Sequence, residues 1–201
     1  MVLAVSVGIS PRQSLASWTD LAGELEAEGV DELWLIDSQL AMKDVYAGLL
    51  LAAQRTSRML LGPGVTNPLT RHPTVTACAV AAVAEVSGGR AALGLGAGDS
   101  AVHGLGWQPA RVAQVEAAIR FLRAVLRGEQ AEWEGRAHRL PYAAGPVPVW
   151  LGCAWSETPL AQVAHTGYPS SNADSGACRV QTPERHAAGS SGDPPPLRSR
   201  V

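Results

Sequence analysis

Short apolar runs alternate with longer amphipathic segments along most of this chain, and this alternation limits the folds open to it more than any other feature. Nearly continuous apolar runs predict buried strands, whereas apolar side chains that recur every three or four residues predict helices. Strands are expected at residues 2–8, 32–36, 58–62, 90–95 and 147–152. Helices are expected at about 14–28, 44–54, 73–86, 112–126 and 157–165, and a short hairpin around 133–135.

This order of elements is typical of α/β folds, in which helices cover a parallel sheet. A doubly wound open sheet and a (β/α) barrel both fit. Every predicted strand is followed by polar or glycine residues, at 8–10, 37–38, 64–67, 96–99 and 152–153. In a barrel all of these loops meet at one face, where active sites lie. In an open sheet the enrichment would be confined to the switch point, so the pattern favours the barrel.

Composition narrows the class of function. The chain has 201 residues, of which 46% are hydrophobic, enough for one domain with a buried core. Its formal net charge of −2 gives no basic surface for nucleic acid. No apolar run reaches the roughly 18 residues of a membrane span, and no signal-peptide pattern precedes the first strand. With cysteines only at 78, 153 and 178, we expect a cytoplasmic protein without nucleic-acid or membrane partners.

The chain changes character near residue 167. From residue 168 to residue 201, serine, glycine, proline and charged residues dominate, and large apolar side chains are rare. Such a segment buries too little apolar surface to offset the entropy lost on ordering. The expected organisation is one domain at 1–167 followed by a disordered tail at 168–201.

Two glycine-containing loops are candidate ligand sites. The loop from Gly94 to Gly98 resembles a phosphate-binding turn, but a tight turn with close backbone packing explains the glycines equally well. Residues 64–68 (GVTNP) offer uncharged hydrogen-bonding groups, although Asn-Pro is also a common turn initiator. Asp99, just beyond the glycine loop, either accepts a hydrogen bond from a ligand or caps the next turn, and Asp37, at the end of the second predicted strand, is either catalytic or satisfies loop amides.

Charged groups elsewhere give weaker signals. Arg71 precedes a predicted helix, where a cation opposes the helix dipole, so a ligand or a carboxylate is its expected partner. The five histidines, at 72, 103, 138, 165 and 186, lack the spacing of metal ligands, and no metal site is predicted. No nucleophile motif of the G-x-S-x-G type occurs.

Three stretches taken together resemble the luciferase-like monooxygenase superfamily. They are residues 33–38 (LWLIDS), 61–76 (LGPGVTNPLTRHPTVT) and 85–99 (EVSGGRAALGLGAGD), in that order. The second is the most specific and is similar to the branch that contains methylenetetrahydromethanopterin reductase and uses the deazaflavin coenzyme F-420. The resemblance covers residues 2–166.

The resemblance implies an α/β fold of the (β/α)8 TIM-barrel type, with the deazaflavin across the carboxyl face of the strands. It implies an oxidoreductase that transfers hydride between coenzyme F-420 and a small organic substrate. An FMN-dependent monooxygenase that uses molecular oxygen is the alternative, because the superfamily contains both kinds of enzyme. The resemblance also suggests a homodimer, since members of the superfamily often dimerise.

Site residues follow from the same resemblance. A non-prolyl cis peptide is expected between Gly64 and Val65, where it would press one face of the ring. Thr66 and Asn67 would hydrogen-bond the polar edge of the ring. Asp37 and Asp99 would border the cofactor and substrate as catalytic groups. The remaining expected cofactor contacts are Gly96, Gly98, Gly152, Cys153 and Ser156.

The chain also departs from the family. A complete barrel of this type needs about 250 residues, whereas the match stops after about five βα units. Residues 168–170 (YPS) stand where the family would begin a sixth strand. We therefore expect an incomplete barrel from a truncated or frame-shifted member. An inactive fragment remains the rival to the enzyme.

Overall fold

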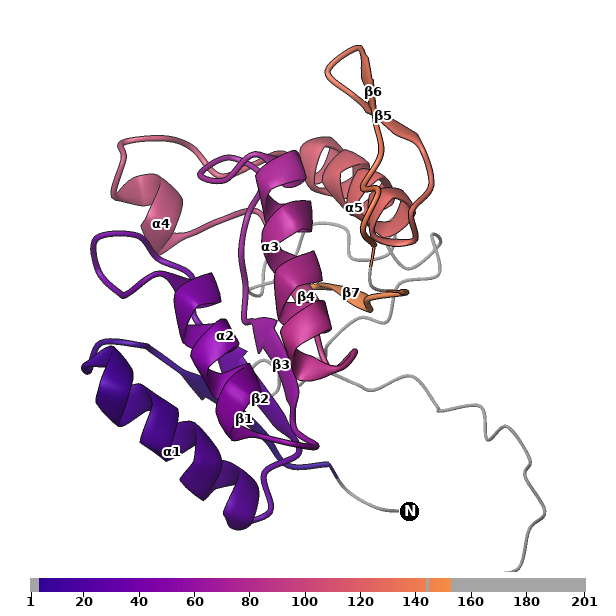
Figure 1. Cartoon of the computed structure of the whole chain (residues 1–201). Helices are drawn as coiled ribbons and strands as arrows, with labels where there is room; N and C mark the ends of the chain where they lie inside the picture. The colour runs from indigo at the N-terminus through magenta and orange to yellow at the C-terminus, as the bar shows by residue number, and fades with distance from the viewer. Residues whose placement is uncertain (1–3, 144, 153–201) are drawn as a thin grey trace, which may run out of the picture.

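The computed structural model describes residues 4–143 and 145–152 (Figure 1). Strands and helices alternate as the sequence predicts, with a hairpin inserted before the last strand. The elements in chain order are β1 (Ser6–Ile9), α1 (Leu15–Ala27), β2 (Glu32–Leu35), α2 (Val45–Arg55), β3 (Leu60–Pro63), α3 (Pro73–Ser87), β4 (Leu93–Leu95), α4 (Ser100–His103), α5 (Val112–Leu126), β5 (Ala131–Trp133), β6 (Arg136–His138) and β7 (Val149–Leu151).

The parallel strands are arranged in the order in which they occur in the chain. β1, β2 and β3 pair in parallel, and β4 pairs in parallel with β7. Two isolated parallel bridges, Leu61 to Ala91 and Thr66 to Leu95, connect β3 with β4. Among the described strands there is therefore no reversal of order of the kind that defines a doubly wound sheet.

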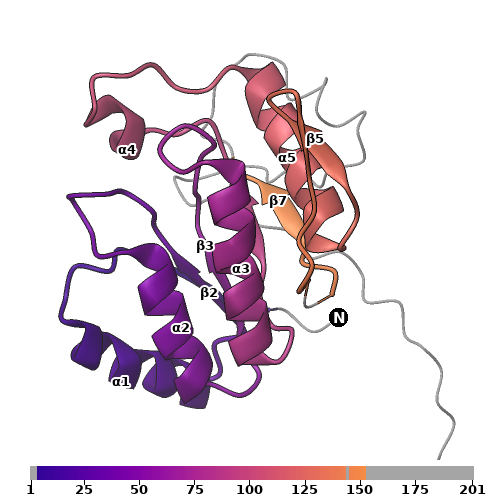
Figure 2. The same cartoon turned by 45° about the horizontal axis from the view of Figure 1, so that its top comes forward.

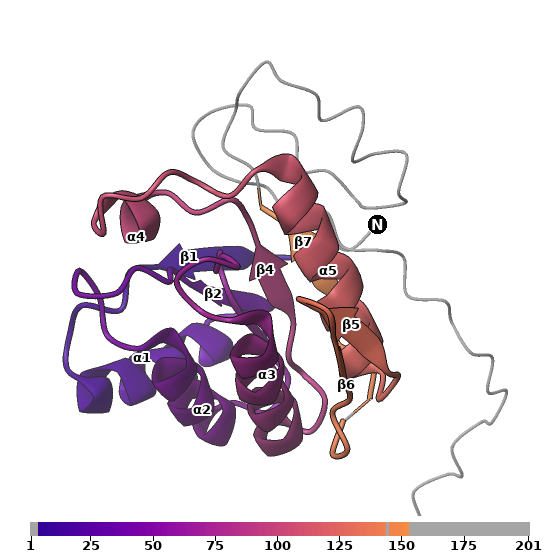
Figure 3. The same cartoon turned by 90° about the horizontal axis from the view of Figure 1, so that it is seen from above.

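The long helices lie on one side of these strands. Figure 2 shows α1, α2 and α3 in sequence along that side, and in the view from above (Figure 3) α5 continues the row beside β4 and β7. Each of these helices packs against the next. The predicted α/β class is confirmed, and the sequential order with one helical layer is the winding that (β/α) barrels use.

Alternate residues of the strands face two different cores. The helix-facing side chains belong to the main hydrophobic cluster, and they include Leu33, Leu35, Leu61, Leu93, Leu95 and Val149. The opposite face carries a second, smaller cluster of Trp34, Ala92 and Trp150. This separation follows from the two-residue period of a strand, which sends successive side chains to opposite faces.

Two tryptophans fill the inner face of the sheet. The rings of Trp34 on β2 and Trp150 on β7 approach to 5.0 Å between centroids, above the intervening strands β3 and β4. Space for them depends on Gly62, because a Cβ there would lie 2.6 Å from the Trp34 ring and 2.6 Å from the Ala92 carbonyl oxygen. The inner face is therefore packed, not open, at this level.

Local signals explain where the helices begin and end. Ser14 caps α1 by accepting from the Ser17 backbone N–H, and Asp44 caps α2. His72 caps α3, whose first residue is Pro73 and whose C-terminal Gly88 has a positive φ of 69°. The predicted helix boundaries agree with these to within one residue.

Some details differ from the sequence predictions. The strands are shorter than expected, because their ends leave the ladder to form loops, and α4 was not predicted because one turn carries no periodicity. The predicted hairpin is present as β5 and β6. The predicted helix at 157–165 and the tail at 168–201 lie outside the described residues. No helix in the part that the structure describes is long and apolar enough to span a membrane.

Candidate functional site

The loops that follow β2 and β4 meet at the carboxyl ends of the strands, which lie at the top of Figure 1. Ser38, next to Asp37, places its Oγ 3.0 Å from the Oγ of Ser100, the neighbour of Asp99. The two segments that carry the predicted acids are therefore in contact, although they lie far apart in the sequence.

Asp37 and Thr66 form the polar centre of this region. The Thr66 hydroxyl donates to Asp37 Oδ2 over 2.6 Å, and Thr66 itself is fully buried. Its backbone is held on both sides, since Thr66 N–H donates to the Gly94 carbonyl and the Thr66 carbonyl accepts from Gly96 N–H. Thr66 thus joins the end of β3 to β4 while its side chain faces the carboxylate after β2.

Burial raises the pKa of the half-buried Asp37 carboxyl above its usual range. The hydrogen bond from Thr66 and the positive charge of Arg71 oppose this shift, and the negative charge of Asp44 adds to it. A carboxyl that is partly withdrawn from water, with one oxygen engaged, is suited to accept or share a proton with a ligand.

A cation and a tyrosine lie beside this pair. Arg71 Nη2 donates to Asp44 Oδ2 over 2.8 Å, and its guanidinium carbon lies 4.8 Å from the centroid of the Tyr46 ring. The carboxylate partner expected for Arg71 is therefore confirmed. Asp44 also accepts from the N–H groups of Tyr46 and Ala47, and although burial pushes its pKa up, these bonds and Arg71 hold the pKa below its usual range.

The Gly64–Val65 segment is a bend between two pairing regions, but the expected cis peptide is wrong. Every peptide bond among the described residues is trans. Gly64 N–H donates to the Leu35 carbonyl over 2.6 Å, and the Thr66 bridge to β4 resumes pairing two residues later. A Cβ on Gly64 would lie 2.6 Å from the Trp34 Cβ, so glycine is needed at position 64 for close packing.

Close packing accounts for the glycines around Val65. A Cβ on Gly94 would lie 2.5 Å from the Pro63 carbonyl oxygen, and one on Gly96 would lie 2.7 Å from the Gly152 carbonyl oxygen. A Cβ on Gly152 would overlap the Val65 side chain. Of the two interpretations that the sequence left open, close backbone packing is what the structure shows. A contact of Gly96 or Gly152 with a cofactor stays a prediction.

Asn67 is used by its own turn. Its Oδ1 accepts from the backbone N–H groups of Leu69 and Thr70, and its Nδ2 donates to Thr70 Oγ1. Only 1% of Asn67 is exposed. The side chain therefore behaves as the turn initiator that Asn-Pro suggested, with one amide hydrogen left over.

Asp99 stands in a different environment from Asp37. Its side chain is 89% exposed, makes no capping bond to α4, and lies 3.3 Å from His103 Nδ1. The preceding Gly98 has a φ of 88° and packs against Val102, so glycine is required there for the turn. Asp99 and Gly98 therefore lie nearer the solvent than the Asp37–Thr66 pair.

The sequence reasoning missed Tyr46 and gave Asp44 no role beyond beginning a helix. No motif marks an aromatic residue two positions after a helix cap, so only the packing of α2 against the loop before α3 reveals the cluster. Cys153 and Ser156, the other predicted cofactor contacts, lie outside the described residues.

Comparisons with known proteins agree on one superfamily. The model of the luciferase-like monooxygenase family matches residues 2–170. The 5,10-methylenetetrahydromethanopterin reductase of Methanolobus tindarius is 35% identical over 150 residues, which cover 71% of this chain and 44% of the relative. This chain thus spans less than half the length of that relative.

Solved structures give the same fold. The coenzyme F-420-dependent tetrahydromethanopterin reductase of Methanopyrus kandleri superposes with a TM-score of 0.60 at 26% identity, over 75% of this chain and 50% of that one. The oxygenating constituent of 3,6-diketocamphane monooxygenase from Pseudomonas putida, a Baeyer-Villiger monooxygenase in complex with FMN, gives 0.60 at 14% identity, over 75% and 51%. At this identity the second comparison concerns the fold alone.

Proposed function

Because this chain belongs to the luciferase-like monooxygenase family, we propose that it takes part in hydride transfer between coenzyme F-420 and a small organic substrate. The observation that carries the proposal is the hydrogen-bonded pair of Asp37 and Thr66, which lies at the carboxyl ends of neighbouring parallel strands. In (β/α) barrels this is the end at which reactants bind. The methylenetetrahydromethanopterin reductase relative supports coenzyme F-420 as the cofactor.

We expect an uncharged planar ring to be held here. Val65, which packs against Gly96 and Gly152, would supply an apolar contact, and Thr66 and Asp37 would supply the polar groups next to it. The nearby cation, Arg71, is already paired with Asp44. Binding of the cofactor phosphate would fall to residues 152–156, as the family resemblance implies. A bound deazaflavin would supply the hydride donor or acceptor.

The protein's own residues would then orient the reactants and manage protons. We assign to Asp37 the role of a proton acceptor or donor toward the substrate, because its carboxyl is half-buried and its pKa is raised by burial. Thr66 holds one oxygen of that carboxyl in place. Asp99, which is exposed, would contact the substrate from the rim.

The fold proposal is an incomplete (β/α)8 barrel. Its support is the sequential order of the parallel strands, the single layer of helices, and the 44% of the reductase relative that the match covers. The expected homodimer and the cytoplasmic location stay predictions.

Parallel titrations with coenzyme F-420 and FMN, followed by the fluorescence of each ring, test the proposed function. We expect saturable binding of coenzyme F-420 at micromolar concentration, tighter than that of FMN. Asp37→Asn should change the affinity at least about fivefold, equivalent to about 1 kcal/mol. Asp20→Asn is the matched control, because Asp20 is an exposed carboxylate on α1, away from this region.

The outcomes separate the alternatives. Tighter binding of FMN would favour the oxygen-using monooxygenase, for which the FMN-containing structural neighbour offers the fold precedent. Absence of saturation with either ring would contradict both enzyme proposals and leave the inactive fragment.

A further inference from the structure

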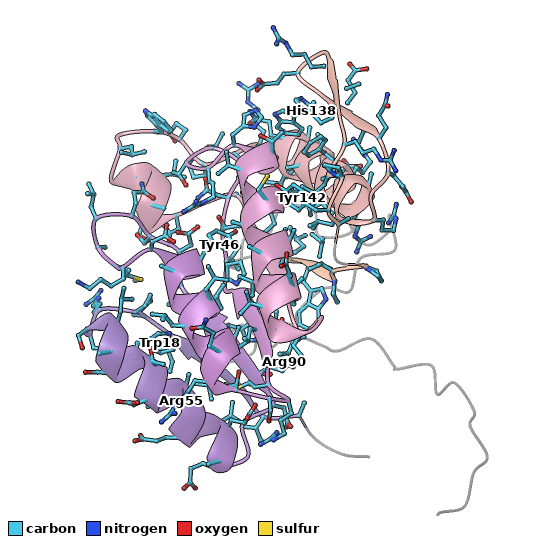
Figure 4. The ribbon with its side chains drawn as sticks, viewed as in Figure 1. Trp18, Tyr46, Arg55, Arg90, His138 and Tyr142 are labelled. Carbon is cyan, nitrogen blue, oxygen red and sulfur yellow. The ribbon has the colours of Figure 1, made fainter. Side chains whose placement is uncertain are left out.

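Tyr46 has a buried hydroxyl group that makes no hydrogen bond to any described residue. The residue is 4% exposed and stands at the beginning of α2, where Figure 4 shows it between that helix and α3. Its ring contacts the guanidinium of Arg71, which would serve a phenylalanine ring equally well. A buried hydroxyl without a hydrogen bond lowers the stability of the fold, so the presence of tyrosine here in place of phenylalanine suggests a role for the hydroxyl.

The groups around the Tyr46 hydroxyl belong to the candidate site. Burial raises the pKa of Tyr46, the negative charges of Asp37 and Asp44 act in the same direction, and Arg71 and the Thr66 hydroxyl lower it. Arg71 donates to Asp44, and Thr66 spends its only hydroxyl proton on Asp37 Oδ2. Thr66 Oγ1 still has free lone pairs, so it can accept a hydrogen bond from the Tyr46 hydroxyl while it keeps its own bond to Asp37.

We propose that Tyr46 is a positioning residue, whose hydroxyl donates to Thr66 Oγ1 and so fixes the direction in which Thr66 donates to Asp37. The chain of donors runs from Tyr46 through Thr66 to Asp37, and each bond polarises the next. Asp37 Oδ1, which has no hydrogen bond among the described residues, is left for the ligand. The inference deepens the proposed function and rests on it, because Asp37 acts only if a ligand binds beside it.

This chain of hydrogen bonds from Tyr46 through Thr66 to Asp37, here called the relay, changes the pKa of Asp37 even in the protein without ligand. The charged groups that act on Asp37 are Arg71 and Asp44, its hydrogen-bond donor is Thr66, and Tyr46 is the titratable neighbour on which the charge of Asp37 acts. Removing the phenolic hydroxyl frees the Thr66 hydroxyl to rotate and weakens its donation to the carboxylate. Because that bond favours the charged form, its weakening raises the pKa of Asp37.

Carboxyl carbon NMR of the full chain labelled at aspartate, with Asp37→Asn for assignment, measures this pKa directly. Tyr46→Phe should raise the pKa of Asp37 by at least about half a unit. Tyr142→Phe is the matched control, because it removes the same atom from an exposed tyrosine that donates to Cys78, and it should leave the titration unchanged. No change in Tyr46→Phe, or a lower pKa, would overturn the relay.

Variants of Thr66 separate the relay from a structural effect. Thr66→Val should raise the pKa of Asp37 at least as much as Tyr46→Phe, and Thr66→Ser, which keeps the hydroxyl, should stay close to the unmodified protein. In the Thr66→Val background, Tyr46→Phe should add nothing. An undiminished effect in that background would show that Tyr46 acts on Asp37 without Thr66 and would also overturn the proposal.

These measurements need no cofactor, so the two proposals fail separately. A shifted titration without binding of either ring would keep the relay and remove the function. Binding of coenzyme F-420 with an unshifted titration would keep the function and remove the relay.

Discussion

Gly62 shows how a single absent side chain shapes the inner face of the sheet. It lies on β3 beneath the Trp34 ring, and a Cβ at this position would collide with both that ring and the carbonyl oxygen of Ala92. Neither neighbour can retreat easily, because one is a buried indole and the other is backbone of the adjacent strand. The glycine is therefore needed for packing, not for an unusual backbone angle.

Gly62→Ala should lower the free energy of unfolding by about 2 kcal/mol, the usual cost of overpacking a tight core. Gly8→Ala is the matched control, because Gly8 pairs with Trp34 on the neighbouring strand and its added Cβ would meet nothing within 4 Å. Urea unfolding followed by tryptophan fluorescence measures both. Equal stability of the two variants would contradict this account of the inner face.

At this scale the sequence revealed residue types but not their partners. Asp37 and Thr66 were singled out individually, yet their hydrogen bond depends on how β2 and β3 align. The sequence left Asn67 as either a ligand contact or a turn initiator, and only the fold shows that its side-chain amide bonds to the backbone of its own loop. The cis peptide was expected from the family resemblance alone, and all described peptide bonds are trans.

Polar clamps tie neighbouring elements together at the opposite end of the strands. Glu26, near the end of α1, accepts from the backbone N–H groups of Ser57, Arg58 and Met59, just before β3. Burial alone would raise the pKa of Glu26, but these bonds and the Ser57 hydroxyl outweigh it and hold the pKa at about 2. Arg90 reaches back from the end of α3 to the Met59 carbonyl.

Acid should release the Glu26 clamp. Since the pKa of Glu26 is about 2 in the folded state and 4.5 without these contacts, its contribution is complete above pH 4.5 and is lost as the pH falls toward 2. Glu26→Gln should cost about 1 kcal/mol at pH 7, after allowance for solvent screening, and progressively less below pH 4.5.

Urea unfolding of both proteins at several pH values between 7 and 3 checks this difference. Glu24→Gln, an exposed glutamate on the same helix, serves as the control. A Glu26→Gln penalty that stayed constant down to pH 3 would contradict the assignment of the clamp to the ionised carboxylate.

Helices were more predictable from the sequence than these clamps. Their periodic apolar faces and caps such as Ser14 and Asp44 are local signals, readable within a few residues. The hydrogen-bond partners of Arg90 and Glu26 lie in other elements, and no local sequence pattern predicts them.

At the scale of the whole described region, parallel strands form a row with one layer of helices, and both features follow from the alternation of strands and helices in the sequence. The inner face does not follow from it, because Trp34 and Trp150 lie far apart in the sequence and meet only when β2 and β7 curve around β3 and β4. Their contact packs the side away from the helices, below the loops that carry Asp37 and Asp99. The proposed ring site therefore lies above a filled core.

Hydrogen–deuterium exchange with and without an excess of coenzyme F-420 tests the location of that site most directly. Bound cofactor should slow exchange in peptides that cover residues 64–67 and 94–98, next to the Asp37–Thr66 pair. Exchange at residues 57–59 should stay unchanged, because these residues precede β3 and bond to Glu26 at the opposite end of the strands. Protection confined to residues 57–59, or none at 64–67, would contradict a cofactor site at the carboxyl ends of the strands.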